Sequence, residues 1–159
     1  MDTAQTDKFN FSLSRRRMLA LGSAGLVCAA FPLSSVAEAA DADKAIKDLF
    51  GDGELQEGRV TVDLPPIAEN GNSVAIKVTV DSPMTETDYV KRIAILSPRN
   101  PIAEVAEFQL GPRAGKAEVA TRIRMAGTQT IRAVAEMSDG TLWIGKASTV
   151  VTLAACIIG

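Results

Sequence analysis

The side chain with the clearest chemical potential in this 159-residue chain is the thiol of Cys156, which stands fourth from the C-terminal end. A thiolate is a strong nucleophile, and an ordinary thiol titrates near pH 8.5, so a few per cent is ionised near neutral pH. This thiol can therefore accept a group when another protein supplies the activation. Free cysteines often behave as small buried hydrophobes, whereas chain ends are usually exposed. The residue type is compatible with either state, and its position favours an exposed, reactive thiol.

Residues 1–39 have the three-part pattern of a secretory signal peptide. An arginine-rich stretch at 14–17 precedes a short apolar run at 19–31, and an Ala-Glu-Ala sequence at 37–39 supplies the small residues that a signal peptidase recognises. The apolar run is shorter than the roughly 20 residues that a transmembrane helix needs, which disfavours a membrane anchor. The arginine pair resembles a twin-arginine signal, which exports folded proteins, and the Sec route is the alternative.

Export would place the mature chain in the periplasm and would remove Cys28 with the signal. Cys156 would then be alone in an oxidising compartment, which indicates either an intermolecular disulfide or a free reactive thiol. The net charge of the whole chain is −2. A charge so close to zero gives no reason to expect nucleic acid or an anionic membrane as a partner, and we expect no membrane insertion after processing.

The sequence supplies no catalytic machinery for this thiol. The chain contains no histidine, which removes Ser-His-Asp and Cys-His pairs and most zinc and copper sites. One remaining cysteine cannot form a C-x-x-C redox pair, and no dinucleotide-binding or P-loop motif occurs. The acidic residues single out no carboxylate pair. We therefore expect no catalytic residue, no cofactor and no metal, and an independent hydrolase is disfavoured because it would lack an activating base.

The chain that follows the signal has the pattern of an all-β domain. Residues 41–50 have helical spacing, with acids in the first turn and Gly51 at the end. After them, apolar and polar residues alternate in about seven short segments separated by proline, glycine and asparagine turns, which is typical of an antiparallel β-sandwich. The expected strands are 58–64, 73–80, 89–96, 103–110, 116–125, 130–137 and 142–153. We expect a domain over 40–153 and an exposed arm over 154–159.

Four further side chains invite a structural or a functional interpretation. Trp143 is expected to pack against the core or a partner rather than to stack on a ligand. Arg122, Arg124 and Arg132 lie on predicted strands and are expected to share one outer face. That face is either an ordinary solvated surface or a patch that steers anions or docks a partner.

Several separate motifs, in the right order, resemble the SoxY proteins of the sulfur-oxidising (Sox) pathway. They are Pro65-Pro66-Ile67-Ala68-Glu69-Asn70-Gly71, Val80-Asp81-Ser82-Pro83-Met84, Asn100-Pro101, Val105-Ala106-Glu107-Phe108, Thr121-Arg122-Ile123-Arg124-Met125-Ala126-Gly127-Thr128-Gln129 and Ser138-Asp139-Gly140. The resemblance implies an immunoglobulin-like sandwich that pairs with a SoxZ-like subunit as a heterodimer or a higher assembly. It also implies that Cys156 is the covalent attachment point for sulfur. A c-type cytochrome complex, a sulfate-releasing hydrolase and a sulfur dehydrogenase would act on the carried sulfur.

The arm differs from the family pattern, in which Gly-Gly-Cys-Gly-Gly stands at the extreme end. Here Ala154-Ala155 precede the cysteine and Ile157-Ile158 follow it. Alanine stiffens the backbone relative to glycine, and branched isoleucine prefers an extended conformation. An extended arm of residues 154–159 would still reach about 20 Å at 3.3–3.6 Å per residue. The alternative hypothesis is a structural or binding subunit whose tail is docked and carries nothing.

Overall fold

The computed structural model of the protein describes residues 33–155, with side chains from Ala42 onward. A helix, α2 (Leu33–Phe50), comes first, and one short 3-10 turn, η1 (Pro112–Ala114), lies between strands. The nine strands of this part of the chain are β1 (Leu55–Glu57), β2 (Val60–Asp63), β3 (Ile67–Asn70), β4 (Val74–Val80), β5 (Val90–Leu96), β6 (Glu104–Gln109), β7 (Glu118–Ile123), β8 (Gln129–Met137) and β9 (Leu142–Leu153).

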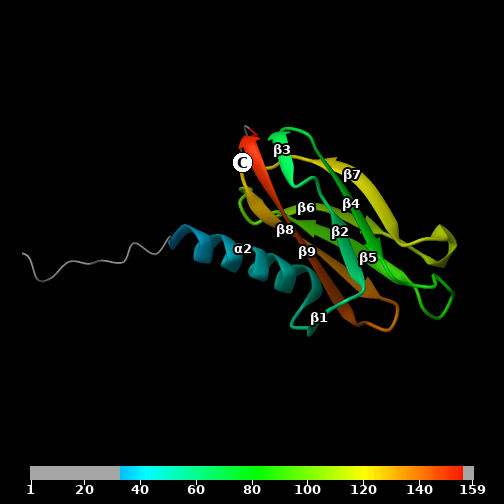
Figure 1. Ribbon diagram of the computed structural model, residues 1–159. Coiled ribbons are helices and arrows are strands. Elements are labelled where there is room, and N and C mark those ends of the chain that lie inside the picture. Colours follow the sequence, from blue (N-terminus) through cyan, green and yellow to red (C-terminus); the bar gives the residue numbers. More distant parts are fainter. Residues whose placement is uncertain (1–32, 156–159) are drawn as a thin grey trace, which may run out of the picture. The chain divides into compact units, whose positions relative to one another are not determined.

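The strands form two sheets that face one another (Figure 1). The large sheet has the order β1-β9-β8-β5-β6, with β3 added alongside β9, and the small sheet has the order β2-β4-β7. Apolar side chains from both sheets meet in one core. In β4 the expected alternation is observed, because Val74, Ile76, Val78 and Val80 are all buried while Ala75 and Lys77 are exposed. The predicted antiparallel β-sandwich is confirmed.

Two short strands were not predicted, and both pair with β9 in parallel. Leu55 of β1 is in register with Leu142, and Ile67 of β3 is in register with Val150. β1 has three residues and β3 has four, too few for a visible alternation of polar and apolar residues. The prolines before β3 also obscure it, because proline usually ends a strand. These strands exist because the long β9 offers a free edge whose backbone groups need partners.

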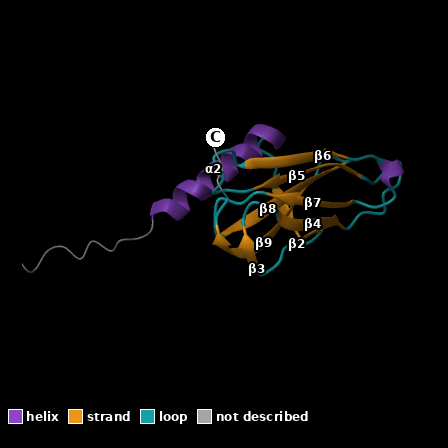
Figure 2. Cartoon of the chain, turned by 90° about the horizontal axis from the view of Figure 1, so that it is seen from above, coloured by secondary structure: helices purple, strands orange, loops and turns teal. Residues whose placement is uncertain are grey.

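The outer face of the large sheet is covered by α2 (Figure 2). Ile46 packs there in a second apolar cluster with Ala94, Leu96, Val134 and Ile144. This contact explains why neighbouring residues of β5 and β8 are buried on both faces of the sheet. The helix begins at Leu33 rather than at residue 41. The expectation of a helix confined to 41–50 was therefore wrong at its start, because the alanine-rich sequence before it also favours helix.

The expected signal peptide lies mostly outside the described residues, and its last seven residues, 33–39, belong to α2. Among the helix side chains that the structure describes, those that pack on the sheet lie from Ala45 to Phe50, after the expected cleavage site. Cleavage after Ala39 would therefore leave these contacts in place. No described helix has the length and apolarity needed to span a bilayer.

The C-terminal end of α2 is held to the large sheet by Arg92 of β5. Its Nη2 donates a hydrogen bond of 2.7 Å to the carbonyl oxygen of Leu49, and its guanidinium lies 4.3 Å from the ring centroid of Phe50. Its Nε donates a hydrogen bond of 2.6 Å to Glu136 on β8. Glu107 on β6 contributes a second carboxylate at 3.6 Å. One side chain therefore satisfies a helix-end carbonyl that has no intrahelical partner and joins three strands.

We predict that Glu136 makes folding stability depend on acid pH. Partial burial raises the pKa of the Glu136 carboxyl, but hydrogen bonds and charges from Arg92 and Lys91 lower that pKa by more, so the net direction is downward. Its stabilising contribution is therefore complete above the unfolded-state pKa of about 4.3 and is lost as the pH falls through the lower folded-state value. Glu136→Gln should lower the free energy of unfolding near neutral pH by about 1–2 kcal/mol.

Urea denaturation of the two proteins across the acid range measures this effect, and the difference between them should shrink as the pH falls. Glu118→Gln is the matched control, because Glu118 is exposed on β7 and forms no ion pair with a described residue. Its stability should change by less than about 0.5 kcal/mol. A pH-independent loss in Glu136→Gln would show that the carboxylate charge is not the cause.

Candidate functional site

Cys156, the predicted site of sulfur attachment, lies outside the described residues. The described residues end at Ala155, which is joined to Cys156 by a peptide bond. Because consecutive Cα atoms are about 3.8 Å apart, the position of Ala155 limits where Cys156 can be. The site is therefore defined by what holds Ala155.

Strand β9 brings the tail to one end of the sandwich, and β3 accompanies it there. Ala68 is in register with Val151, and Asn70 is in register with Leu153. Directly after β3, the backbone N–H of Gly71 donates a hydrogen bond of 2.7 Å to the carbonyl oxygen of Leu153. The strand pairing thus continues as far as the last residue of β9.

Two further backbone hydrogen bonds carry the tail across to the small sheet. The N–H of Met125, two residues after β7, donates to the carbonyl oxygen of Gly71 at 2.8 Å. The N–H of Ala155 donates to the carbonyl oxygen of Met125 at 3.0 Å. We call these four residues (Gly71, Met125, Leu153 and Ala155) the tail clamp. The clamp links the ends of β9, β3 and β7 through backbone groups alone.

The clamp changes the expected start of the exposed arm. Ala154 is exposed as expected, but Ala155 is 8% exposed and is hydrogen bonded. The expectation of exposure does not hold for Ala155, because folding brings its N–H to the carbonyl oxygen of Met125. Cys156 is therefore the first residue after a buried and hydrogen-bonded position.

The loop between β7 and β8 supports this end of the domain. The hydroxyl of Thr128 accepts a hydrogen bond of 2.9 Å from the N–H of Val151, and the carbonyl of Thr128 accepts one from Arg99. The side chain of the buried Gln129 accepts hydrogen bonds from the hydroxyl of Ser97 and the N–H of Arg99. These bonds satisfy the buried polar groups here and hold the loop against β9.

Two of the three predicted surface arginines lie near the tail clamp. Arg122 and Arg124 are exposed at the end of β7, next to Met125 in sequence. Arg122 donates hydrogen bonds to the hydroxyl and the carbonyl oxygen of Ser73. Among the described residues, neither arginine forms an ion pair with a carboxylate. The expectation of a shared face was wrong for Arg132, which lies on β8 and pairs with Asp43 of α2.

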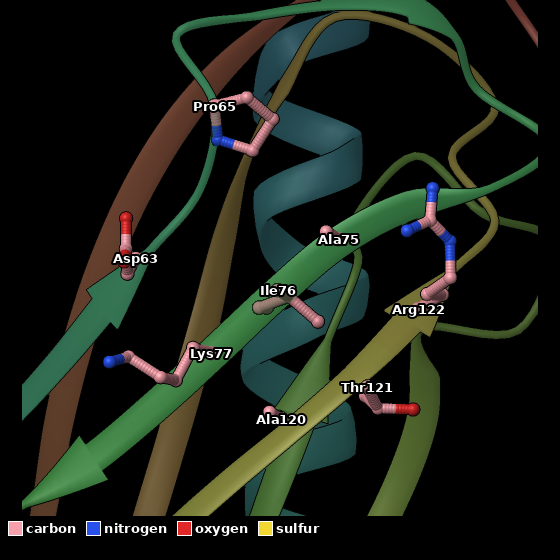
Figure 3. A pocket seen from close by; sticks show the side chains of 8 residues that line it. All are labelled: Asp63, Pro65, Ala75, Ile76, Lys77, Ala120, Thr121 and Arg122. Carbon is pink, nitrogen blue, oxygen red and sulfur yellow. The ribbon is translucent and has the colours of Figure 1, made fainter.

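Beside Arg122, the outer face of the small sheet has an open hollow of about 400 Å³. Figure 3 shows Ala75 and Ala120 in the middle of this hollow, with Lys77 and Arg122 on either side of them. The short alanine side chains create the depression, and Asp63, the register partner of Lys77, adds a carboxylate at one border. No cysteine lines the hollow, and its opposite charges do not favour a single kind of ligand.

Other sequence-predicted features have structural roles. Trp143 packs against the core and lies under the Arg59 guanidinium, which is 5.1 Å from the ring centroid. Packing against the core is thus confirmed for this side chain. Within residues 33–155, no group of three acidic, histidine or cysteine side chains is arranged to hold a metal ion.

Comparisons with known proteins establish the family. The family described as "Sulfur oxidation protein SoxY" matches residues 46–156 of the chain. The solved structure of the sulfur carrier protein SoxY from Chlorobium limicola f thiosulfatophilum has 34% sequence identity and a TM-score of 0.62, covering 72% of this chain and 99% of that one. No curated protein matches the chain significantly. The family match and the structural likeness place the chain in a family of sulfur carrier proteins. The chain belongs to the SoxY family, as its motifs predicted, and its immunoglobulin-like sandwich is the SoxY fold.

More distant structures share the sandwich alone. A superoxide reductase (neelaredoxin) from Ignicoccus hospitalis has 12% identity and a TM-score of 0.52 over 59% of this chain and 80% of that one. A "putative superoxide reductase" from Thermotoga maritima has 20% identity and a TM-score of 0.50 over 62% of this chain and 87% of that one. At these identities the likeness concerns the arrangement of strands and says nothing of a shared reaction.

Sequence reasoning found the cysteine but not the contacts that position it. At the Asn70-Gly71 turn, Asn70 accepts hydrogen bonds from the backbone and side chain of Asn72. Nothing in the sequence indicated that this turn binds the tail. Met125 lies two residues after β7 and is fully buried. Its role in the clamp comes from its backbone, which has no sequence signature.

We predict that Arg124 speeds the reaction of Cys156 with anions. Removing one nearby positive charge weakens the attraction of a dianion in water by under about 1 kcal/mol, so Arg124→Gln should slow a dianionic disulfide reagent by about two- to four-fold at low salt. The rate with neutral iodoacetamide should be unchanged, and added salt should abolish the difference. Stopped-flow absorbance and mass spectrometry measure the two rates.

Arg113→Gln is the matched control for this prediction. Arg113 is equally exposed but lies on η1, before the start of β7, whereas Arg124 follows the end of that strand. This substitution should leave both rates unchanged. Equal slowing of the neutral reagent by Arg124→Gln would indicate a change in exposure of the thiol and would contradict the electrostatic explanation.

Proposed function

We propose that this SoxY protein carries thiosulfate-derived sulfur on Cys156, in the periplasm, as a complex with a SoxZ-like subunit. The observation that supports the proposal is the anchoring of Ala155, the residue that precedes this cysteine in the sequence. Cys156 follows directly on the tail clamp, at the end of the strand around which the large sheet is built. A thiol at this place stays attached to a rigid domain and is the first residue beyond it.

The loading step needs an oxidant that the carrier does not contain. The thiol sulfur of Cys156 forms a bond with the outer sulfur of thiosulfate and loses its proton, giving a cysteine S-thiosulfonate. Two electrons leave in this step and are accepted by a c-type cytochrome complex. A hydrolase then cleaves the sulfur–sulfonate bond with water and releases sulfate, and a sulfur dehydrogenase oxidises the sulfur that remains on the cysteine.

The described residues support the carrier role without adding catalysis. The chain has no histidine to act as a general base beside the thiol. Arg122 and Arg124 place positive charge at the end of the domain where the anionic adduct would form, which favours an anion there. Activation is thus left to the partner enzymes, and the domain contributes the attachment point and the local electrostatic field.

Intact-mass analysis tests the proposal. We expect the mature protein, incubated with thiosulfate and the oxidising cytochrome complex, to gain the mass of one S-thiosulfonate group, which a reducing agent removes. The Cys156→Ser variant should gain nothing. Unmodified wild-type protein, under conditions where a glycine-flanked relative is loaded, would overturn the proposal.

The burial and hydrogen bonding of Ala155 favour a second candidate, a structural subunit with a docked tail. In that case the chain would still bind a SoxZ-like subunit, but replacing the thiol would have no consequence. We expect Cys156→Ser to abolish thiosulfate oxidation in cells while the complex still forms. Unchanged oxidation with an intact complex would establish the structural role instead.

A further inference from the structure

Gly71 occupies a place in which no side chain fits. A Cβ atom built on it would lie 2.4 Å from the carbonyl oxygen of Met125, 2.9 Å from the backbone nitrogen of Ala155 and 3.1 Å from a methyl group of Val151. The first two are backbone atoms of the tail clamp, which cannot rotate away as the end of a flexible side chain can. The backbone of Gly71 is not in the left-handed region. The requirement for glycine is therefore one of space and not of conformation.

The crowding bears on one particular hydrogen bond. The two atoms nearest to that Cβ, the oxygen of Met125 and the nitrogen of Ala155, are the acceptor and the donor of the same 3.0 Å bond. Met125 is fully buried and follows β7, whereas Ala155 is held by this one backbone bond close to the chain end. A methyl group at position 71 would therefore displace the tail sooner than it would displace Met125.

We propose that Gly71 is a positioning residue for Cys156, because its missing side chain allows Ala155 to dock and so holds the carrier thiol at the end of the domain. This inference rests on the carrier role proposed above. With the clamp closed, Cys156 starts about 3.8 Å from a buried Cα atom. Opening the contacts of residues 153–155 would add about 10 Å of reach at 3.3–3.6 Å per residue. The clamp thus sets how far the thiol extends toward a partner enzyme.

A closed clamp gives the thiol less reach than the flexible arm that the family's glycine-flanked pattern would suggest. A partner enzyme must either approach the domain end formed by the turn after β3 and the segment after β7, or open the clamp. Ala155 is compatible with this arrangement because its methyl group is buried without crowding Gly71, which has no side chain.

Digestion of the purified protein with carboxypeptidase, followed by intact-mass analysis, tests the positioning role. In the wild type, trimming should pause once Ala155 has become the last residue. In Gly71→Ala the pause should disappear and trimming should continue into β9. The rate of removal of residue 155 should rise by about two- to twelve-fold, the factor expected for losing one backbone hydrogen bond.

Two glycine variants separate positioning from a general loss of stability. Gly111→Ala is the neutral control, because Gly111 has extended backbone and no atom within 4 Å of its added Cβ. Gly145→Ala crowds the carbonyl oxygen of Val60 at 2.4 Å, inside the sandwich. Gly111→Ala should behave as the wild type, while Gly145→Ala should lower the unfolding midpoint and keep the pause at Ala155.

A fourth variant keeps the test decisive if Gly71→Ala does not fold. Ala155→Pro removes the N–H donor of the clamp without adding bulk at position 71. Because carboxypeptidases act poorly at proline, this variant is read by the rate at which neutral iodoacetamide modifies Cys156. That rate should rise as it does in Gly71→Ala, with little change in the unfolding midpoint. A pause retained in a folded Gly71→Ala, or an unchanged iodoacetamide rate in Ala155→Pro, would overturn the positioning role.

These outcomes are distinguishable from failure of the proposed function. Trimming does not depend on sulfur, and loading is measured separately by mass. If the wild type shows the pause and Gly71→Ala abolishes it, but Cys156 never takes up sulfur, the clamp is real and the carrier role is wrong. If Cys156 is loaded but no variant changes the pause, the carrier role stands and the positioning role is wrong.

Discussion

The structure depends on the backbone hydrogen bonding of β9 along both of its edges. β8 pairs with one edge over residues 142–149, and the short strands β1 and β3 pair with the two ends of the other edge. Buried backbone groups are costly to leave without partners, so each of these strands stabilises the position of β9. Because Cys156 follows β9 by three residues, the same bonds that build the large sheet determine where the thiol leaves the domain.

The two ends of the described domain are held by different interactions. At the C-terminal end of α2, Arg92 joins a helix carbonyl, an aromatic ring and two carboxylates. That contact is electrostatic and depends on the charge of Glu136. At the tail clamp, all three bonds join backbone groups that do not titrate. The position of the tail is therefore insensitive to pH in a way that the attachment of the helix is not.

A carrier that performs no turnover still needs a defined geometry. Under the proposed carrier role, the thiol has to reach partner enzymes, yet it must not collapse into the core as free cysteines often do. An attachment point at a buried, hydrogen-bonded alanine meets both requirements, because it fixes the root of the tail and leaves only the last four residues beyond it. The isoleucines after the cysteine would be a poor choice for a long flexible arm, but a closed clamp keeps the arm short in any case.

The regular strands were predictable because each carries its own signal. In β4 and β7 the apolar residues alternate over six or seven positions, and alternation reflects one buried and one solvated face. β3 has one buried residue among four, so its identity as a strand comes from pairing with a distant segment. Arg132 illustrates the same limit. Its charge was evident, but its partner on α2 lies 89 positions away along the chain.

The sequence alone predicted the lone thiol, the lack of a histidine base to activate it, the β-sandwich and the family. Each of these follows from residue types or from patterns within a few neighbouring positions. The anchoring of the tail arose only on folding, because Gly71, Met125 and Ala155 are far apart in the chain. They meet through N–H and carbonyl groups that every residue except proline possesses. Such contacts do not depend on side-chain type and therefore have no sequence pattern. Only the tertiary structure shows that Ala155, the residue before the cysteine, is anchored to the domain.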